Sequence, residues 1–405
     1  MVPKINVAAS DQQSARFMYM YALAVSGSAI AYVPFLTILL PLRATALEGD
    51  NALNVLAMAA FAGAIAASIA NIGFGWASDV ARTRRPWIIA GLLLSTIMLL
   101  AMPLATSVTM LIIMIVLWQF ALNMMLAPLA AWAGDSIPDS QKGMLGGLLA
   151  LAPALGALSG AVVTIEGFTP FADRETLVAL FVVLTVTPAL LLGQPVPMPH
   201  LMPAAATEEH EAAILLIHRR ATVQMWLARL LVQIAEASLF AFLLLWFRSI
   251  NPDFSPNNAA TIFAIVLGLA VFLALAVGRW SDRFNRPILP LIWGAAVAAA
   301  GLIIMSVATN MTVAIIGYVA FGLASSIFLA LHSSQTLRVL PRRHTRGRDL
   351  GIFNLTNTFP SLIMPWLTLA LVPAYGFYAL FLLLAALAIV AALLLLNMRR
   401  PVQNR

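Results

Sequence analysis

Three polar side chains interrupt a long apolar stretch in the second half of the sequence. Arg229, Gln233 and Glu236 stand at positions i, i+4 and i+7, so a helix would carry them on one face. Glu236 is midway along the stretch, where an ionisable group in hydrocarbon costs at least about 2.5 kcal/mol unless it meets a partner or a cavity. A carboxylic acid avoids that cost by holding a proton, so Glu236 is a candidate proton acceptor.

Arg229 and Glu236 also have ordinary alternative roles. Arg229 is about 10 Å from Glu236 along a straight helix, from a rise of about 1.5 Å per residue. It can reach toward water or pair with another helix. Glu236 can equally be a hydrogen-bonded residue between helices, without any exchange of protons.

The composition places these residues in a membrane. Hydrophobic residues make up 62% of the chain and charged residues 10%, against about 45 to 50% and about 25% in an average soluble domain. Because backbone polar groups in lipid must be satisfied within each segment, long apolar stretches are predicted to be helices. Twelve such stretches are found, at about 17–40, 52–77, 87–105, 108–133, 144–164, 176–193, 222–247, 259–281, 288–307, 310–337, 350–372 and 375–397.

Net charge alone would allow a nucleic-acid partner, since the formal charge is +7. Nineteen of the 23 Lys and Arg, however, fall at the termini or in the even-numbered loops, and only Arg43, Arg174 and Arg248 fall on the other side. The positive-inside rule then predicts that both termini are in the cytoplasm. The positive charge therefore sets membrane orientation and gives no reason to expect nucleic acid.

Landmarks repeat along the chain at one spacing. Ser78-Asp79 returns as Ser281-Asp282, and Pro138 returns as Pro341, each 203 residues later. We therefore predict an all-α membrane protein of two pseudo-symmetric six-helix bundles, one of the known designs of secondary transporters. The predicted divisions are an N-terminal bundle at 1–193, a cytoplasmic linker at 194–220 and a C-terminal bundle at 221–405.

The loop after the second stretch resembles the signature loop of the major facilitator superfamily, G-x-x-x-D-x-x-[GR]-[RK]-x-[GR]-[RK]. Gly75 and Asp79 take the Gly and Asp positions, and Arg82, Arg84 and Arg85 follow. Thr83 and Pro86 depart from the basic tail of the pattern. With twelve stretches and a central linker, the resemblance covers the whole chain and implies the fold of that superfamily.

The resemblance implies a gate at the cytoplasmic side. Asp79 would face the N-terminus of the eleventh helix, and Asp282 that of the fifth, with an attraction of about 0.3 to 2 kcal/mol. The alternative is that each aspartate is a solvated loop charge balanced by nearby arginines. Gly75 and Gly278 are expected to allow close approach of helices. The predicted gating residues are Gly75, Asp79, Arg82, Arg85, Gly278, Asp282, Arg283 and Arg286.

The resemblance also implies that helices one, four, seven and ten line a central cavity. The predicted cavity residues are Tyr32, Gln119, Asn123, Gln233, His332, Asn354 and Asn357, with Glu236 and Arg229 assigned to proton coupling. For each of these the alternative is an ordinary packing or hydrogen-bonding role, and His332 near a helix end is the clearest case. A narrower likeness, carried by Ser78-Asp79, Arg82 to Ile88, Val339 to Pro341 and Asp349 to Pro360, is to sucrose and maltose type proton symporters.

Motifs of other function classes are missing. The sequence has no P-loop, no Gly-x-Ser-x-Gly, no His-Glu-x-x-His and no cysteine. We therefore predict neither an enzyme nor a primary pump, and neither a cofactor nor a metal.

The predicted function is movement of a small organic solute, with sugars and glycosides as the leading class, by alternating access. Protons are the predicted coupling ion, and the protein is expected to be a monomer in the inner or plasma membrane. A drug or metabolite exporter is the first alternative, because the segments are rich in Met (18 in the chain) and aromatic residues. A non-transporting membrane sensor or assembly factor is the second.

Overall fold

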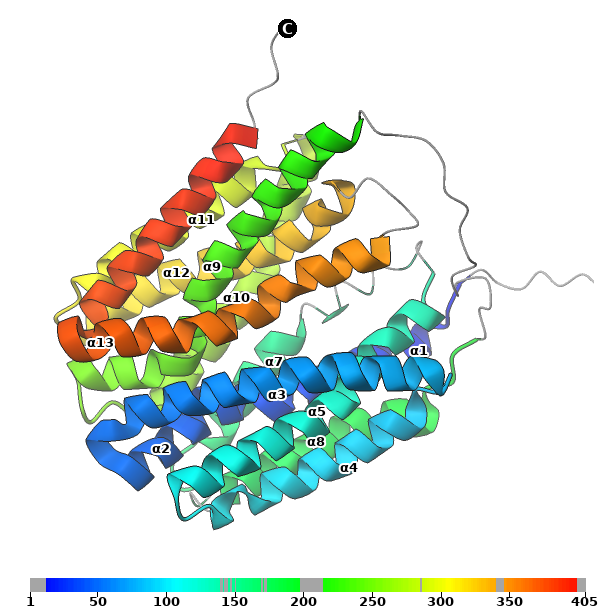
Figure 1. Cartoon of the computed structure of the whole chain (residues 1–405), viewed down its shortest axis with the longest axis horizontal. Coiled ribbons are helices and arrows are strands. Elements are labelled where there is room, and N and C mark those ends of the chain that lie inside the picture. Colours follow the sequence, from blue (N-terminus) through cyan, green and yellow to red (C-terminus); the bar gives the residue numbers. More distant parts are fainter. Residues whose placement is uncertain are drawn as a thin grey trace, which may run out of the picture.

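The computed structural model describes residues 12–138, 141, 145, 148–149, 151–168, 170, 173–196, 214–284, 286–339 and 346–398. Within these ranges the regular structure is helical and no strand occurs (Figure 1). The helices form two bodies that lie side by side, α1 to α8 below and α9 to α13 above in this view. We call the end where α8 finishes and α9 begins the linker end, and the opposite end the far end.

The first half holds six crossings. A π-helical turn, η1, joins α1 to α2 in one crossing, and short 3-10 turns flank α2 and α4. The elements are α1 (Ala15–Pro34), η1 (Phe35–Leu39), α2 (Leu40–Glu48), η2 (Gly49–Asn51), α3 (Ala52–Val80), α4 (Arg85–Ala101), η3 (Met102–Leu104), α5 (Val108–Ser136), α7 (Leu151–Val163) and α8 (Arg174–Leu192).

The second half holds the other six. Its elements are α9 (Ile214–Ile250), α10 (Pro256–Arg283), α11 (Leu289–Ser306), α12 (Met311–Val339) and α13 (Arg346–Met398). α13 turns back on itself at Gly376, whose φ of 73° is a left-handed conformation that glycine adopts without strain. α9 begins inside the range predicted for the linker.

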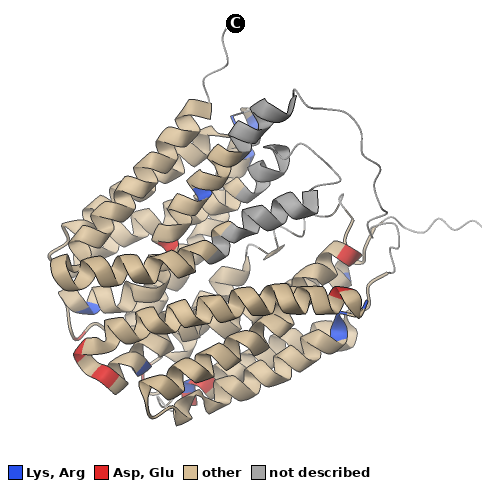
Figure 2. Ribbon diagram, viewed as in Figure 1, with Lys and Arg blue, Asp and Glu red and all other residues tan. Residues whose placement is uncertain are grey.

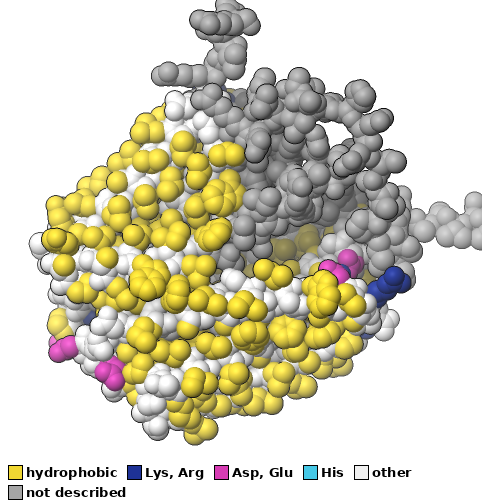
Figure 3. Space-filling view, viewed as in Figure 1, with side chains coloured by type: hydrophobic (Ala, Val, Ile, Leu, Met, Phe, Trp, Pro, Cys, Tyr) yellow, Lys and Arg dark blue, Asp and Glu magenta, His cyan; other side chains and the backbone are white. Residues whose placement is uncertain are grey.

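The predicted number of crossings is confirmed for the part of the chain that the structure describes. Nine apolar helical runs there are long enough to cross a membrane, and two of them, Ala15–Val80 and Phe359–Met398, contain a reversal and so make two crossings each. The shorter α7 supplies the twelfth. Figure 2 shows the charged residues gathered mostly at the helix ends, and Figure 3 shows a broad apolar surface between them.

The same helix contacts occur in both halves. α5 packs against α3 and α4, and α12 packs against α10 and α11 in the same way. Between the halves, α7 contacts α10, and the first leg of α13 contacts α3. In the repeat, α7 corresponds to the first leg of α13 and α10 corresponds to α3, so the two contacts are equivalent. The halves are therefore related by a pseudo-two-fold, as the sequence repeat predicts.

One close backbone contact shows the repeat at the level of residues. A Cβ on Gly91 of α4 would lie 2.3 Å from the backbone nitrogen of Met125 on α5. A Cβ on Gly294 of α11 would lie 3.2 Å from the Cβ of Phe328 on α12. Gly91 and Gly294 are 203 residues apart in the sequence, and so are Met125 and Phe328. The duplication therefore preserved a close helix contact that the small glycine makes possible.

The described contacts between the halves include a polar group at the far end. The side-chain amide of Asn257, at the start of α10, donates to the carbonyl of Ala161 at 2.7 Å and to the hydroxyl of Thr164 at 3.2 Å. Farther along, the rings of Phe61 on α3 and Trp366 on α13 meet edge to face at 5.3 Å. These contacts hold the halves together on the side away from the linker.

We expect Gly91→Ala to lower the melting temperature in detergent. The new methyl group would meet the backbone of α5, which no rotamer change can move, so α4 and α5 must separate at a cost of about 1–3 kcal/mol. Gly73→Ala on α3 is the matched control, because nothing lies within 4 Å of its Cβ position. Differential scanning fluorimetry gives the comparison, and equal melting temperatures for the two variants would contradict this account of the packing.

Candidate functional site

The polar group predicted on α9 forms as the helical spacing requires. The Nε2 atom of Gln233 donates to Oε2 of Glu236 at 3.0 Å, and both side chains are partly exposed. The other amide atom of Gln233, Oε1, is buried without a hydrogen-bond partner among the described residues. The amide therefore has one free acceptor beside the carboxylate.

Glu236 lies at the interface between the two halves. Tyr32 on α1 and Tyr318 on α12 are both close enough to interact electrostatically with its carboxylate. Tyr32 also packs against Phe240, one turn beyond Glu236 on α9, with ring centroids 6.4 Å apart. The Glu236 carboxylate is thus within electrostatic reach of a residue of the opposite half.

Arg229 is the cation nearest to this carboxylate along α9. Its Nε donates to the hydroxyl of Thr356 on α13 at 3.0 Å, and its Nη1 donates to the carbonyl of Leu329 on α12 at 3.4 Å. It also interacts electrostatically with Glu236. Arg229 therefore ties three helices of the second half together.

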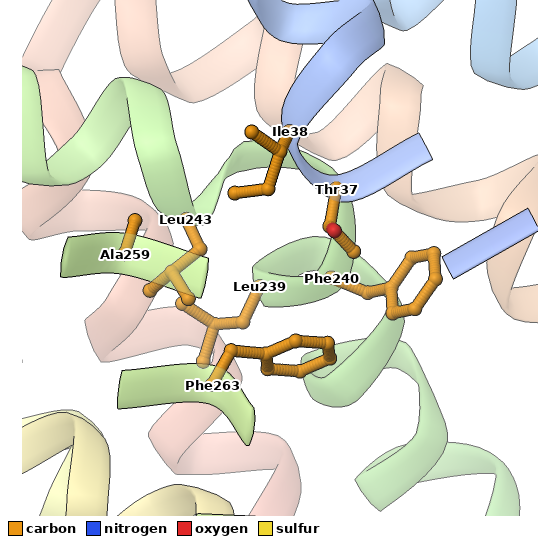
Figure 4. Close-up of a pocket in the computed structure, with 7 residues that line it drawn as sticks. All are labelled: Thr37, Ile38, Leu239, Phe240, Leu243, Ala259 and Phe263. Atoms are coloured by element: carbon orange, nitrogen blue, oxygen red, sulfur yellow. The ribbon is translucent and has the colours of Figure 1, made fainter. Parts of the chain in front are cut away.

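A group of mainly apolar side chains, which we call the hydrophobic seal, includes the residues that follow Glu236 on α9 toward the far end (Figure 4). It surrounds a cavity with room for no more than about one water molecule. The hydroxyl of Thr37 donates to the carbonyl of Val33 in its own helix at 2.7 Å, so the seal offers no polar group to a solute. The residues come from η1, α9 and α10: Thr37, Ile38, Leu239, Phe240, Leu243, Ala259 and Phe263.

The predicted cavity residues of the fourth crossing form a separate amide cluster. Nδ2 of Asn123 donates to the carbonyl of Gln119 at 2.9 Å and to its Oε1 at 3.3 Å. Asn71 on α3 donates to Oδ1 of Asn123 at 3.2 Å. The cluster joins α5 to α3 inside the first half, and both predicted members are buried.

His332 is fully buried. Its Nε2 lies 2.9 Å from the carbonyl of Met225, and its ring packs on Phe328 at a centroid distance of 5.4 Å. Asn354 and Asn357 lie in the first leg of α13, but their side chains are outside the described set. Of the predicted cavity residues, the structure therefore brings Tyr32 and Gln233 next to Glu236.

The signature loop of the first half is organised by Arg84. Its guanidinium bonds Asp79 at 2.6 Å, Asp135 at 2.8 Å and the hydroxyl of Ser78 at 2.6 Å. Partial burial lowers the pKa of Arg84, but the two carboxylates outweigh this and raise the pKa overall. Asp79 is thus paired within its own loop, and its proposed contact with the eleventh crossing remains a prediction.

Two other arginines of this loop differ in environment. Arg82 is exposed and has a φ of 50°, a left-handed conformation that costs a residue with a side chain on the order of 1 kcal/mol. Arg85 donates to the carbonyl of Gly193 and lies over the ring of Trp132 at 5.4 Å. Arg85 therefore fixes the end of α8, where the linker begins.

Gly75, the glycine predicted to allow close approach of helices in this loop, does not lie in a tight contact. A Cβ built on Gly75 would lie 3.9 Å from the Cβ of Ala127, which is an ordinary van der Waals distance.

The signature loop of the second half is built differently. The backbone of Arg286 bonds Ser281 twice, through N–H to the serine carbonyl at 3.0 Å and through its own carbonyl to the serine hydroxyl at 3.2 Å. Arg283 and Arg286 are exposed, and the side chain of Asp282 is outside the described set. A Cβ on Gly278 would lie 3.3 Å from Leu331, so α10 and α12 approach closely there.

Several site residues escaped the sequence analysis. Asn71, Tyr318 and Thr356 each join a predicted residue from a distant helix. An Asn in an apolar stretch is a signal that could have drawn attention to Asn71, but Tyr and Thr at such positions are common. The buried ion pair of Arg43 and Glu175, between α2 and α8 at the far end, was also missed. No group of acidic or His residues in the described ranges could hold a metal.

We expect Arg84→Met to destabilise the protein more than Arg82→Met. The first change leaves Asp79 and Asp135 without their shared cation, at a cost on the order of 1 kcal/mol because both carboxylates are partly exposed. Arg82 is exposed in the same loop and serves as the control. Adding Asp135→Asn to Arg84→Met should recover part of the melting temperature, and no recovery would argue against the shared pairing.

Known proteins resemble this chain in two ways: a family sequence model matches its second half, and solved structures share the fold of nearly the whole chain. Residues 225–405 match the sequence model of the Major Facilitator Superfamily. The fold is similar to that of a bacterial homolog of the human lysosomal transporter Spinster in an inward-facing and unoccupied conformation, with TM-score 0.68 and 14% identity over 96% of this chain and 98% of that chain.

The fold is also similar to that of an auto-inhibited peptide transporter of the POT family. The TM-score is 0.71, with 13% identity over 96% of this chain and 97% of that chain. No curated protein sequence matches the chain. The sequence match to the superfamily model thus covers the second half, while the fold of the whole chain, a multi-pass helical membrane fold, is similar to that of these two transporters.

Proposed function

We propose that the protein is a secondary transporter that couples proton movement to a small, neutral organic solute by alternating access. Glu236 carries the proton. The observation that supports this most directly is the position of Glu236 on α9, one turn before Phe240, which packs against Tyr32 of the opposite half, with its carboxylate within electrostatic reach of Tyr32. A group in that position experiences a different environment whenever the halves tilt.

The hydrophobic seal favours one direction of access in this structure. Leu239 and Phe240, three and four residues after Glu236, close the far side together with Thr37 of the opposite half. In this proposal the seal blocks approach from the far end, and a proton or a solute reaches Glu236 from the linker end while the seal is intact. Alternating access would open the seal and close the linker end.

The amide of Gln233 supplies a way to link the proton to the solute. With Glu236 ionised, Nε2 of Gln233 donates to the carboxylate and Oε1 is left as an acceptor. A protonated Glu236 has a hydroxyl to donate, and rotation of the amide would turn Oε1 toward it. The amide atom that is left without a partner, which a solute would meet once the site opens, then changes from an acceptor to a donor.

The charges near the site favour a neutral solute. Arg229 and Glu236 carry opposite charges and interact with each other. While Glu236 is ionised, a charged solute would leave one charge in excess in a medium of low dielectric constant, which is costly. Hydroxyl groups satisfy the amide without adding charge, so sugars and glycosides remain the first class to test and peptides the second.

The signature loops would act as a gate at the linker end, which the distribution of Lys and Arg predicts to be cytoplasmic. Asp79 bonds Arg84 and is 64% exposed in this structure, in which the halves meet at the far end. Closing the linker end would bring Asp79 to the start of α13. Asp79 would then bond Arg84 while the linker end is open and the start of α13 while the linker end is closed, so each partner stabilises one state.

We expect Glu236→Gln to abolish uptake driven by a pH gradient while exchange of solute across liposomes continues. A ligand stability screen over sugars, organic acids, peptides and amphipathic drugs first identifies the solute. Reconstituted protein is then assayed with and without an inward proton gradient. Asp253→Asn, which removes an exposed carboxylate at the far end, is the control. Full gradient-driven accumulation by Glu236→Gln would rule out the role of this carboxylate.

For Gln233→Leu we expect solute affinity to fall about tenfold, because one hydrogen bond of about 1–1.5 kcal/mol is lost. The pH dependence of binding should also weaken, since the amide no longer reports the state of Glu236. Gln224→Leu is the matched control, because Gln224 lies nine residues earlier and hence on the opposite face of α9. Equal affinity and an unchanged pH profile in Gln233→Leu would overturn the proposed coupling.

A further inference from the structure

One face of α10 is not covered by the rest of the protein. In the apolar window of Pro256–Ser281 only 17% is buried, against 33 to 61% in the other long apolar runs. Ile265, Leu269 and Phe272 are 61%, 46% and 69% exposed. Their spacing of four and three residues places them on one side of the helix, so they form a continuous apolar stripe.

The stripe runs directly into a basic and aromatic cluster at the linker end. Arg279 and Arg283 follow Phe272 on the same side of α10, and both are exposed. Trp280 is 43% exposed and packs on Phe284, 56% exposed, with ring centroids 5.4 Å apart. The opposite side of the helix, at Gly278, contacts Leu331 of α12, so the cluster points away from the bundle.

The two repeats use their arginines in different ways. In the first half the hydroxyl of Ser78 accepts a hydrogen bond from the guanidinium of Arg84, which is held inside the loop. In the second half Ser281 is bonded to the backbone of Arg286 instead, and the arginine is exposed. The second loop therefore presents Arg286 on its surface.

The charge and the depth of the cluster indicate its partner. Residues 279–286 contain three Arg and one Asp, a formal charge of +2 even with Asp282 counted in full. Guanidinium groups bind phosphate through two parallel hydrogen bonds, and Trp is favoured at the level of lipid headgroups. Leu269 is about 15 Å from Arg279 along the axis, which is half of the ~30 Å hydrocarbon thickness.

We propose that this face of α10 is a binding site for an anionic phospholipid of the linker-side leaflet. The phosphate lies on Arg279, Arg283 and Arg286, the interfacial rings of Trp280 and Phe284 flank the glycerol region, and an acyl chain follows Phe272 and Leu269 to the middle of the bilayer. The site is separate from Glu236 and stands independently of the proposed function.

Native mass spectrometry from mixed micelles of phosphatidylglycerol and phosphatidylcholine tests the proposal. Wild-type protein should retain phosphatidylglycerol in preference to phosphatidylcholine. The triple variant Arg279→Gln, Arg283→Gln, Arg286→Gln should lose this preference by roughly fivefold per arginine removed. The triple Lys variant keeps the charge but not the paired hydrogen bonds, so its retention should fall between the two.

Two further variants make the result specific to this site. Arg16→Gln removes an exposed cation at the same end but outside the cluster, and it should retain phosphatidylglycerol as the wild type does. Phe272→Ala should weaken retention of both lipids without changing the preference. Equal retention of the two lipids by wild type, or an unchanged preference in the triple Gln variant, would overturn the proposal. So would a loss in Arg16→Gln as large as that in the triple variant.

Discussion

Hydrocarbon offers no water to satisfy a polar group, and this constraint decides which side chains of the protein are free to act. Short hydroxyl side chains solve it locally, as Thr37, Thr185 and Ser238 do by donating to the carbonyl four residues earlier in their own helices. Longer amides and charged groups must find partners elsewhere. Those partners lie on other helices or on the next turn, so the polar atoms inside the bundle mark the places where helices are tied together. The free acceptor of Gln233 is notable because it lacks such a tie within the described residues.

Duplication and divergence can be separated residue by residue. The contacts of Gly91 with α5 and of Gly294 with α12 are the same contact in two copies, and close approach of backbones leaves little room for change. The signature loops lie at the helix ends, where water relaxes the constraint, and there the copies differ. Ser78 and Ser281 keep their burial but not their partners. The core of each repeat therefore preserved its geometry, while the loops were free to acquire different interactions.

Much of the fold could be predicted from the sequence, because length and polarity are local properties in a membrane. The number of crossings, the repeat at 203 residues and the face shared by Gln233 and Glu236 all follow from spacing alone. Partners from distant helices could not be predicted in this way. Thr356 and Asn71 became part of the site only through the packing of α13 on α9 and of α3 on α5. The contacts of Asn71 with Asn123 and of Asp135 with Arg84 likewise needed coordinates, since these partners are about 50 residues apart in the sequence.

The π-helical turn η1 gives the first crossing an unusual register. Pro34 has no N–H to donate, and the N–H of Leu40 bonds the carbonyl of Phe35, five residues earlier. A π turn holds one residue more than the α-helix on either side of it. Converting η1 to α-helical bonding would rotate the residues on one side by about 100° relative to the other. Thr37 and Ile38 would then leave the surface that they share with α9 and α10, so a rearrangement of a few backbone hydrogen bonds is sufficient to unseat the barrier beside Glu236 without unfolding the helix.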